Sequence, residues 1–310
     1  MLMVDICWDR VIVFIPSPQP SPKGRGSSIS LMERARVRVN QELLMPYISV
    51  NGANIYYEEH GQGTQTIVFA HGLLWSGQMY EAQVAFFKQY YRCITFDFRA
   101  QGRSQATESG YDMDTLAADA LALIKQLVGK PVHFVGLSMG GFVGMRLAIH
   151  HREWLLSLSL LETSADPEPK QNLLKYKVLP KIACWLGMAV VAPQAMHIMF
   201  GQTFLTDPQR AEQRAEMRRR LLQNDRINIG KAINGVFSRQ GVYQYLPSIT
   251  TPTLIVVGDE DIATIPAKSR RMHAAIKHSQ LVVIPQAGHT STVETPDAVN
   301  AALEKFIKVT

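Results

Sequence analysis

The sequence predicts an α/β fold in which a mostly parallel sheet of eight strands carries helices on both faces. Short apolar runs alternate with amphipathic segments of helical length over most of the chain, which is the pattern of parallel strands joined by helical crossovers. This alternation is interrupted once, by a long stretch without strand signals. The length of 310 residues suits one large domain with an insert, and the hydrophobic share of 46% is sufficient for a sizeable core.

The predicted strands begin with a hairpin. Residues 47–50 and 55–59 flank Asn51-Gly52, a dipeptide typical of two-residue hairpin turns. Six further apolar runs are read as buried strands: 66–70, 93–96, 132–136, 156–161, 253–257 and 281–284. Helical periodicity is found at 78–90, 114–128 with Asp114 as a candidate N-cap, 142–150, 266–276 and 296–307.

The strand-free stretch, residues 165–248, is predicted to be a helical cap inserted after the sixth strand. The core would then consist of residues 45–164 and 249–310. The apolar part at 178–200 is interrupted by Pro180, Gly187 and Pro193, which favours short cap helices over a membrane span. A cap covers the carboxyl ends of the strands, where open α/β sheets bind ligands. The candidate pocket residues are Leu74, Trp75, Trp185, Met188, Met199 and Phe204.

The first 44 residues differ from the rest in composition. Residues 16–26 are rich in proline, serine and glycine and predict no packed element. We expect a disordered extension, with Met45 as a natural start. The alternative is a short basic arm for targeting or for binding a partner.

Composition also narrows the class of protein. The net charge of +6 comes without interleaved basic and aromatic residues, so we expect no nucleic-acid partner. Cys7, Cys93 and Cys184 are far apart and form no CxxC pair, which indicates neither a disulfide framework nor a zinc site and favours a cytoplasmic protein. We expect no membrane span, and no pattern defines an oligomeric state.

A candidate nucleophile follows the strand at 132–136. In Gly136-Leu-Ser138-Met-Gly140 a serine lies between a strand and a helix, and the glycines remove the β-carbons that would collide in so tight a turn. The strained serine would present its hydroxyl above the sheet edge.

A serine hydroxyl needs a base, and the base needs an orienting carboxylate. Of nine histidines, His289 follows the last strand at the same sheet edge as the serine. Asp259, Glu260 and Asp261 follow the seventh strand, and we favour Asp261 because the loop must extend beyond the strand before a short side chain reaches the histidine. Asp259 and Glu260 are read as solvated residues that cap the next helix.

Two backbone N–H groups are candidates for an oxyanion hole. Met139 N–H lies in the first helical turn after the serine, and Leu73 N–H follows the third strand beside Gly72. His71 is expected to brace this loop by hydrogen bonds.

Taken in order, these motifs resemble the α/β-hydrolase superfamily from Met45 to the end of the chain. They are His71-Gly72, the segment from Asp97 to Ser104, the turn around Ser138, Gly258 to Asp261, and Gly288-His289 followed by Glu294 and Pro296. The resemblance implies that Ser138, Asp261 and His289 form a catalytic triad. It also implies a structural turn at 97–104, with Ala100 where a glycine is more usual, so that Asp97 and Arg99 are scaffold.

The branch of the superfamily is indicated less sharply. Residues 261–269 are similar to those of carboxylesterases and 3-oxoadipate enol-lactonase-like proteins. Leu73-Leu74 departs from the glycine-rich loop of the carbon–carbon bond hydrolases. The dehalogenase and epoxide-hydrolase branches carry an aspartate in place of Ser138.

We therefore expect a serine hydrolase that cleaves a carboxylic ester or lactone of small to medium size, without a metal or organic cofactor. The alternatives are a cofactor-free perhydrolase or haloperoxidase-like enzyme, an amidase, or a carbon–carbon bond hydrolase. From another class, a non-catalytic receptor of the same fold would bind a small hydrophobic ligand under the cap.

Overall fold

The computed structural model describes residues 46–169, 185 and 187–310. Its centre is an eight-stranded sheet in the order β1-β2-β4-β3-β5-β6-β7-β8, in which the pairs β1–β2 and β2–β4 are antiparallel and the other pairs are parallel. The strands are β1 (Tyr47–Val50), β2 (Ala53–His60), β3 (Thr66–Ala70), β4 (Arg92–Phe96), β5 (Val132–Leu137), β6 (Leu155–Leu161), β7 (Thr253–Gly258) and β8 (Gln280–Ile284). The predicted α/β fold with a mostly parallel eight-stranded sheet is confirmed.

The hairpin between β1 and β2 turns on Asn51 and Gly52. Their φ angles are 47° and 77°, so both central residues lie in the left-handed region that a two-residue type I′ turn requires. Val50 pairs with Ala53 directly across this turn. The Asn-Gly signal therefore sets the register of the edge hairpin.

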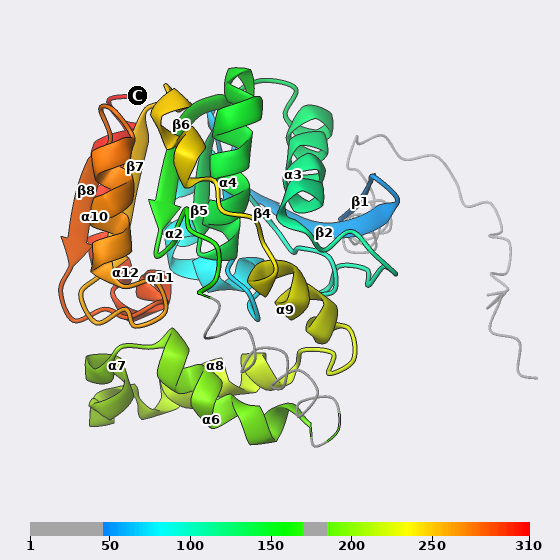
Figure 1. Ribbon diagram of the computed structural model, residues 1–310, viewed down its shortest axis with the longest axis vertical. Helices are drawn as coiled ribbons and strands as arrows, with labels where there is room; N and C mark the ends of the chain where they lie inside the picture. Colours follow the sequence, from blue (N-terminus) through cyan, green and yellow to red (C-terminus); the bar gives the residue numbers. More distant parts are fainter. Residues whose placement is uncertain (1–45, 170–184, 186) are drawn as a thin grey trace, which may run out of the picture. The chain divides into compact units, whose positions relative to one another are not determined.

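Helices cover both faces of the sheet. In Figure 1, α3, α4 and α10 lie in front of the strands, while α2 and α12 lie behind them. The helices of the core are η1 (Gly77–Tyr80), α2 (Glu81–Phe87), α3 (Met113–Leu127), α4 (Met139–His150), η2 (Arg152–Trp154), η4 (Tyr243–Ser248), α10 (Pro266–Ala275), α11 (Ser291–Glu294) and α12 (Pro296–Ile307). The helix expected at 78–90 is thus a 3₁₀ turn followed by a short α-helix.

The N-cap predicted for α3 was placed two residues too late. Asp112 is the cap, because its carboxylate accepts hydrogen bonds from the N–H and the hydroxyl of Thr115, at 2.8 and 2.7 Å. Asp114 instead lies in the first turn and pairs with Arg146 Nε at 2.6 Å. Both aspartates stand before the same apolar periodicity, so the sequence did not distinguish them.

Between β6 and β7, the described residues form helices and no strand. Besides η4, which contacts α4 and α10 of the core, these helices are α6 (Met188–Met199), α7 (Gln202–Thr206), η3 (Pro208–Arg210), α8 (Ala211–Leu222) and α9 (Ile229–Phe237). The strand arrows of β6 and β8 in Figure 1 point towards α6, α7 and α8. We propose that these helices form the cap expected for residues 165–248. The expected extension at 1–44 lies outside the described residues.

The turn after β4 is held by buried charges. Asp97 accepts hydrogen bonds from the N–H groups of Gly77 and Arg103, at 2.7 and 2.8 Å. Arg99 makes a two-bond ion pair with Asp119, with both side chains almost fully buried. Ala100 has a φ of 58°, the conformation for which glycine is the easier residue. Asp97 and Arg99 therefore stabilise the turn and face no cavity that contains Ser138.

Two further observations concern the described part of the chain. Burial raises the pKa of Cys93 to about 12, so this thiol stays protonated. No described helix is long and apolar enough to cross a membrane.

Candidate active site

Ser138 lies in a strained turn between β5 and α4. Its φ is 51° and its ψ is −108°, a conformation that few residues other than glycine adopt. A β-carbon on Gly136 would lie 2.3 Å from the carbonyl oxygen of Gly140, and one on Gly140 would lie 2.0 Å from that of Ala70. Neither position admits a side chain, so both glycines are required for this turn.

The backbone of Ser138 is fixed from the neighbouring strand. Its N–H donates to the carbonyl of Leu161 at 2.8 Å, and its carbonyl accepts a hydrogen bond from Thr163 Oγ1 at 2.8 Å. The side-chain Oγ has no hydrogen bond to another described residue, and it lines a cavity. A fixed backbone with an unengaged hydroxyl is the arrangement that a nucleophile needs.

Asp261 and His289 form a buried pair at the same edge of the sheet. His289 Nδ1 lies 3.0 Å from Asp261 Oδ2 and 3.1 Å from Oδ1. The carboxylate also accepts hydrogen bonds from the N–H groups of Ala263 and Thr264 and from Thr264 Oγ1. Burial by itself raises the pKa of Asp261, but the charge of His289 and these hydrogen bonds outweigh it and hold that pKa below the usual value.

His289 and Ser138 line one cavity of about 520 Å³. No hydrogen bond joins them among the described residues, although both are in place around the same space. In unliganded enzymes the nucleophile–base hydrogen bond is often long and shortens when substrate binds. With Nδ1 engaged by the carboxylate, Nε2 is the nitrogen left for a proton from Ser138.

The two other acids of the Asp261 loop do not have the role expected for them. Asp259 Oδ1 accepts a hydrogen bond from Gln286 N at 2.7 Å, and Glu260 Oε2 accepts one from Thr203 N at 2.8 Å. Helix α10 has no side-chain cap. The expectation that Asp259 and Glu260 cap this helix was therefore wrong, because each reaches a partner from a distant segment.

The two candidate oxyanion donors lie next to Ser138. Met139 is fully buried and opens α4, so its N–H belongs to the free first turn of the helix. A β-carbon on Gly72 would lie 3.6 Å from that of Ser138, which places the loop after β3 against the nucleophile. Leu73 lines the cavity with Ser138.

The loop that carries Leu73 is braced from both sides. Leu74 has a φ of 73°; its N–H donates to Gln101 Oε1 at 2.8 Å and its carbonyl accepts from Asn224 Nδ2 at 2.9 Å. His71 Nε2 accepts from Phe98 N at 2.9 Å, while Nδ1 lies 2.7 Å from the Gly72 carbonyl. Burial lowers the pKa of His71, so it is a neutral imidazole with its proton on Nδ1.

The cavity wall is mainly apolar. Its apolar residues are Leu73, Leu74, Phe142, Met188, Val191, Ala195, Ile198, Met199, Ile233, Val236, Phe237, Ile262, Ala263 and Ile265. Glu168, Arg239 and Lys268 add charged groups, and Arg239 lies 3.5 Å from Glu168. Both the core and the helices between β6 and β7 contribute, so the cavity lies between them.

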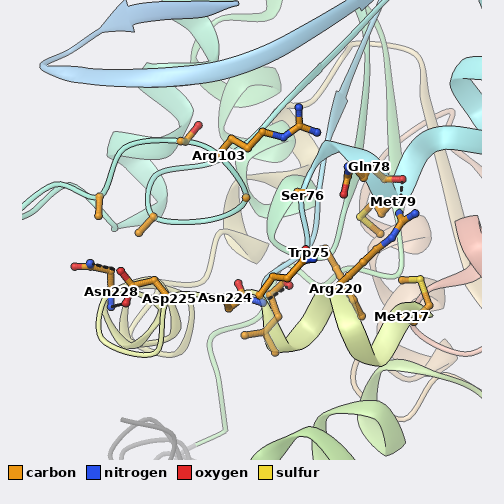
Figure 2. A pocket seen from close by; sticks show the side chains of 16 residues that line it. Trp75, Ser76, Gln78, Met79, Arg103, Met217, Arg220, Asn224, Asp225 and Asn228 are labelled. Carbon is orange, nitrogen blue, oxygen red and sulfur yellow. Dashed lines mark hydrogen bonds between the residues drawn. The ribbon is translucent and has the colours of Figure 1, made fainter. Parts of the chain in front are cut away.

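Three of the six predicted pocket residues line this cavity: Leu74, Met188 and Met199. The other three do not, and their placement was wrong. Trp185 is 85% exposed, and Phe204 is fully buried in a stack on Phe200. Trp75 lines a second cavity of about 370 Å³, seen in Figure 2 between the loop after β3 and residues of the α8 end such as Arg220 and Asn224.

Glu162 is a buried group that the sequence reading missed. It follows β6, is fully buried, and neither of its carboxyl oxygens has a hydrogen-bond partner among the described residues. Burial, and next the charge of Asp261, raise its pKa well above the usual value. Burial therefore favours the neutral, protonated form of Glu162. A lone acid directly after an apolar strand at this edge was the available signal.

We expect Glu162→Gln to stabilise the protein more as pH rises. The unfolded chain releases the Glu162 proton above its ordinary pKa while the folded chain retains it, so the wild type loses about 1.4 kcal/mol per pH unit relative to the variant. Urea unfolding at pH 4, 5, 6 and 7 measures the difference, which should be smallest at pH 4. A difference that does not change with pH would contradict the buried neutral acid.

The sheet order, the strained serine turn and the buried acid–base pair are together those of an α/β hydrolase. The chain belongs to this family: the model of the "Alpha/beta hydrolase family" matches residues 67–302. Among the described residues, no group of three or more His, Cys, Asp or Glu side chains could hold a metal ion.

The relatives of known name include both hydrolases and haloperoxidases. A 3-oxoadipate enol-lactonase from Acinetobacter baylyi is 28% identical over 81% of this chain and 92% of its own length. A non-heme haloperoxidase from Rhodococcus erythropolis is 30% identical over 85% of this chain and its full length. The structure of the enol-lactonase from Burkholderia xenovorans matches with a TM-score of 0.79 at 26% identity, over 85% of this chain and all of its own. These likenesses support a hydrolase activity.

Proposed function

We propose that the protein is a serine hydrolase that cleaves a carboxylic ester or lactone of small to medium size. The observation that carries this proposal is the buried His289–Asp261 pair, at 3.0 Å, at the wall of the cavity that Ser138 also lines. The enol-lactonase names among the relatives support the same substrate class.

The mechanism follows from the groups around the cavity. Ser138 Oγ attacks the carbonyl carbon of the substrate while His289 Nε2 accepts its proton. The N–H groups of Leu73 and Met139 stabilise the negative oxygen of the tetrahedral intermediate. His289 then protonates the leaving alcohol, and the acyl group stays on Ser138. Water, deprotonated by His289, releases it in the second half of the reaction.

Asp261 has two effects in this scheme. It accepts the Nδ1 proton of His289, so that Nε2 is free to act as the base, and its charge stabilises the imidazolium that forms. The hydrogen bonds from Ala263 and Thr264 hold its carboxylate ionised in a buried place.

The size and lining of the cavity favour an acyl group of medium length. A volume of about 520 Å³ lies within the range of small-molecule sites, and most of the wall is aliphatic or aromatic. We expect p-nitrophenyl esters of graded chain length, tested with γ- and δ-lactones, to show an optimum at an intermediate acyl length. Equal rates for all lengths would contradict binding of the acyl group in this cavity.

The second candidate is a cofactor-free perhydrolase, in which hydrogen peroxide takes the place of water on the acyl-enzyme. The 30% identical haloperoxidase is the observation in its favour. Peroxide-dependent halogenation in the absence of any ester or lactone turnover would make this reading the better one. An amide or a carbon–carbon bond as the cleaved bond uses the same triad, and Leu73-Leu74 gives no glycine-rich loop in favour of the latter.

A receptor that binds a small hydrophobic ligand without catalysis is the remaining alternative. A fluorophosphonate probe separates it from an enzyme, because the probe reacts only with an activated serine. We expect stoichiometric labelling of the wild type and none of Ser138→Ala. Equal labelling of both proteins would refute the proposed nucleophile.

A further inference from the structure

Glu294 is a buried carboxylate that no step of the proposed mechanism uses. It ends α11 and is 1% exposed. Its Oε2 accepts hydrogen bonds from the N–H groups of Gly201 and Gly288, at 2.8 and 2.9 Å, and its Oε1 accepts one from Thr290 N at 3.0 Å. Gly288 and Thr290 are the two neighbours of His289 in the chain. One carboxylate therefore holds the backbone on both sides of the candidate base.

The same carboxylate joins this loop to the segment between β6 and β7. Gly201 belongs to that segment, and a β-carbon on Gly288 would lie 2.1 Å from Gly201 N, so the two backbones are in close contact. Thr290 Oγ1 donates to the carbonyl of Met199 at 2.8 Å, and Met199 lines the substrate cavity. Hydrogen bonds thus join the cavity wall at Met199 to the loop that carries His289.

The three N–H donors require the ionised form of Glu294. Burial raises its pKa, while the three hydrogen bonds and the charge of His289 act in the opposite direction and offset only part of the rise. The charged and titratable groups around it are His289, Glu162 and Glu260, and Arg210 donates to its backbone carbonyl at 2.5 Å. Its proton is therefore taken up at a higher pH than that of an exposed glutamate.

We propose that Glu294 is a positioning residue for His289, which fixes the two peptide groups that flank the imidazole and ties them to the wall of the substrate cavity. The proposal rests on the proposed function, since it concerns the base of that reaction.

An amide cannot replace the carboxylate in this position. Each of the two carboxyl oxygens of Glu294 accepts from a residue adjacent to His289. In Glu294→Gln, one of these sites becomes an NH₂ group that faces an N–H donor, whichever way the amide is turned. Protonation of the carboxyl weakens the same hydrogen bonds, because a hydroxyl oxygen is a poorer acceptor than a carboxylate oxygen. One neighbour of His289 then loses its hydrogen bond while the volume stays unchanged.

Glu260→Gln is the matched control. Glu260 Oε2 accepts from the N–H of Thr203, in the same segment that Glu294 holds, but its side chain bonds no residue of the His289 loop. If Glu294 only fastened that segment to the core, both amide variants would show the same loss.

The experiment compares wild type, Glu294→Gln and Glu260→Gln in ester turnover and in the rate of fluorophosphonate labelling of Ser138. We expect Glu294→Gln to lower kcat and the labelling rate at least tenfold, with a KM within threefold of the wild-type value. For Glu260→Gln we expect kcat, KM and the labelling rate all to stay within threefold of wild type. The ratio of the wild-type to the Glu294→Gln labelling rate should fall towards one in acid, where Glu294 is protonated. A ratio that does not change with pH, or equal losses in both variants, would overturn the proposal.

Two features of this experiment distinguish failure of the proposal from failure of the proposed function or of folding. Labelling measures the reactivity of Ser138 and His289 even if the protein turns over no ester or lactone. Absence of turnover would count only against the proposed substrate class. If Glu294→Gln does not fold, the pH dependence of the wild-type labelling rate is measured instead. The fall of this rate in acid then tests the proposal. A rate that falls in acid with two protons taken up, the additional step being at least tenfold, supports the proposal. A fall that takes up only one proton overturns it.

Discussion

Replacing Ser138 with alanine is expected to abolish turnover of every ester and lactone substrate. The proposed acyl-enzyme forms on its Oγ, and loss of the nucleophile of a triad lowers kcat by about 10⁵–10⁶-fold. Folding should be retained, because alanine keeps the β-carbon that already occupies this strained conformation and the lost hydroxyl has no hydrogen bond to another described residue. Turnover assays with thermal unfolding of both proteins check the two halves of this expectation.

His289→Ala is the companion of this variant. Because nucleophile and base act as a unit, we expect it to lose about as much activity as Ser138→Ala, and the double variant to lose little more. Residual ester turnover above about a hundredth of the wild-type rate in Ser138→Ala would show that another group is the nucleophile.

The elements around Ser138 could be predicted because each is specified by its own residues. The strand before it is buried and mainly apolar, and the glycines at 136 and 140 permit the tight turn that follows, because β-carbons at these positions would clash with the backbone. The carboxyl ends of neighbouring parallel strands meet at one edge, so the loops after β7 and β8 had to lie near this turn. The proximity of Asp261 to His289 follows from that topology.

The cavity could not be predicted in the same way. Which face of a helix between β6 and β7 meets the substrate depends on how the helices pack, and the apolar residues of α6 and α7 do not by themselves show it. Phe204 and Met199 are close in sequence, yet one is stacked in a core and the other lines the cavity. Leu74 lines both cavities, whereas the next residue, Trp75, lines only the second.

The roles of two buried glutamates were also not predicted from the sequence. Glu162 and Glu294 both lie at the edge of the sheet that carries the candidate triad. Glu162 has no hydrogen-bond partner among the residues that the structure describes, and Glu294 has three backbone donors. Sequence spacing identifies a candidate base and acid but not the groups that hold their loops, because those bonds join residues as far apart as Gly201 and Glu294. Only the folded backbone brings them together.

The second large effect is expected for Asp261→Asn, with a fall in kcat of about 10⁴-fold and little change in stability. Asparagine keeps an acceptor for the N–H groups of Ala263 and Thr264, so the loop retains its hydrogen bonds. Its NH₂ group then donates to His289 Nδ1, which places the imidazole proton on Nε2. In that tautomer His289 cannot accept the proton of Ser138, and the charge of Asp261 no longer stabilises the imidazolium.

Asp259→Asn is the control that decides between the acids of this loop. Asp259 is exposed, and within the described part of the chain its carboxylate accepts only from Gln286 N, so its amide variant should keep kcat within threefold of the wild type. Measured side by side, a silent Asp261→Asn and a severe Asp259→Asn would reverse the assignment of the acid. The geometry argues for the expected order, because a hydrogen bond of 3.0 Å to His289 Nδ1 determines the tautomer and Asp259 has no contact with that ring.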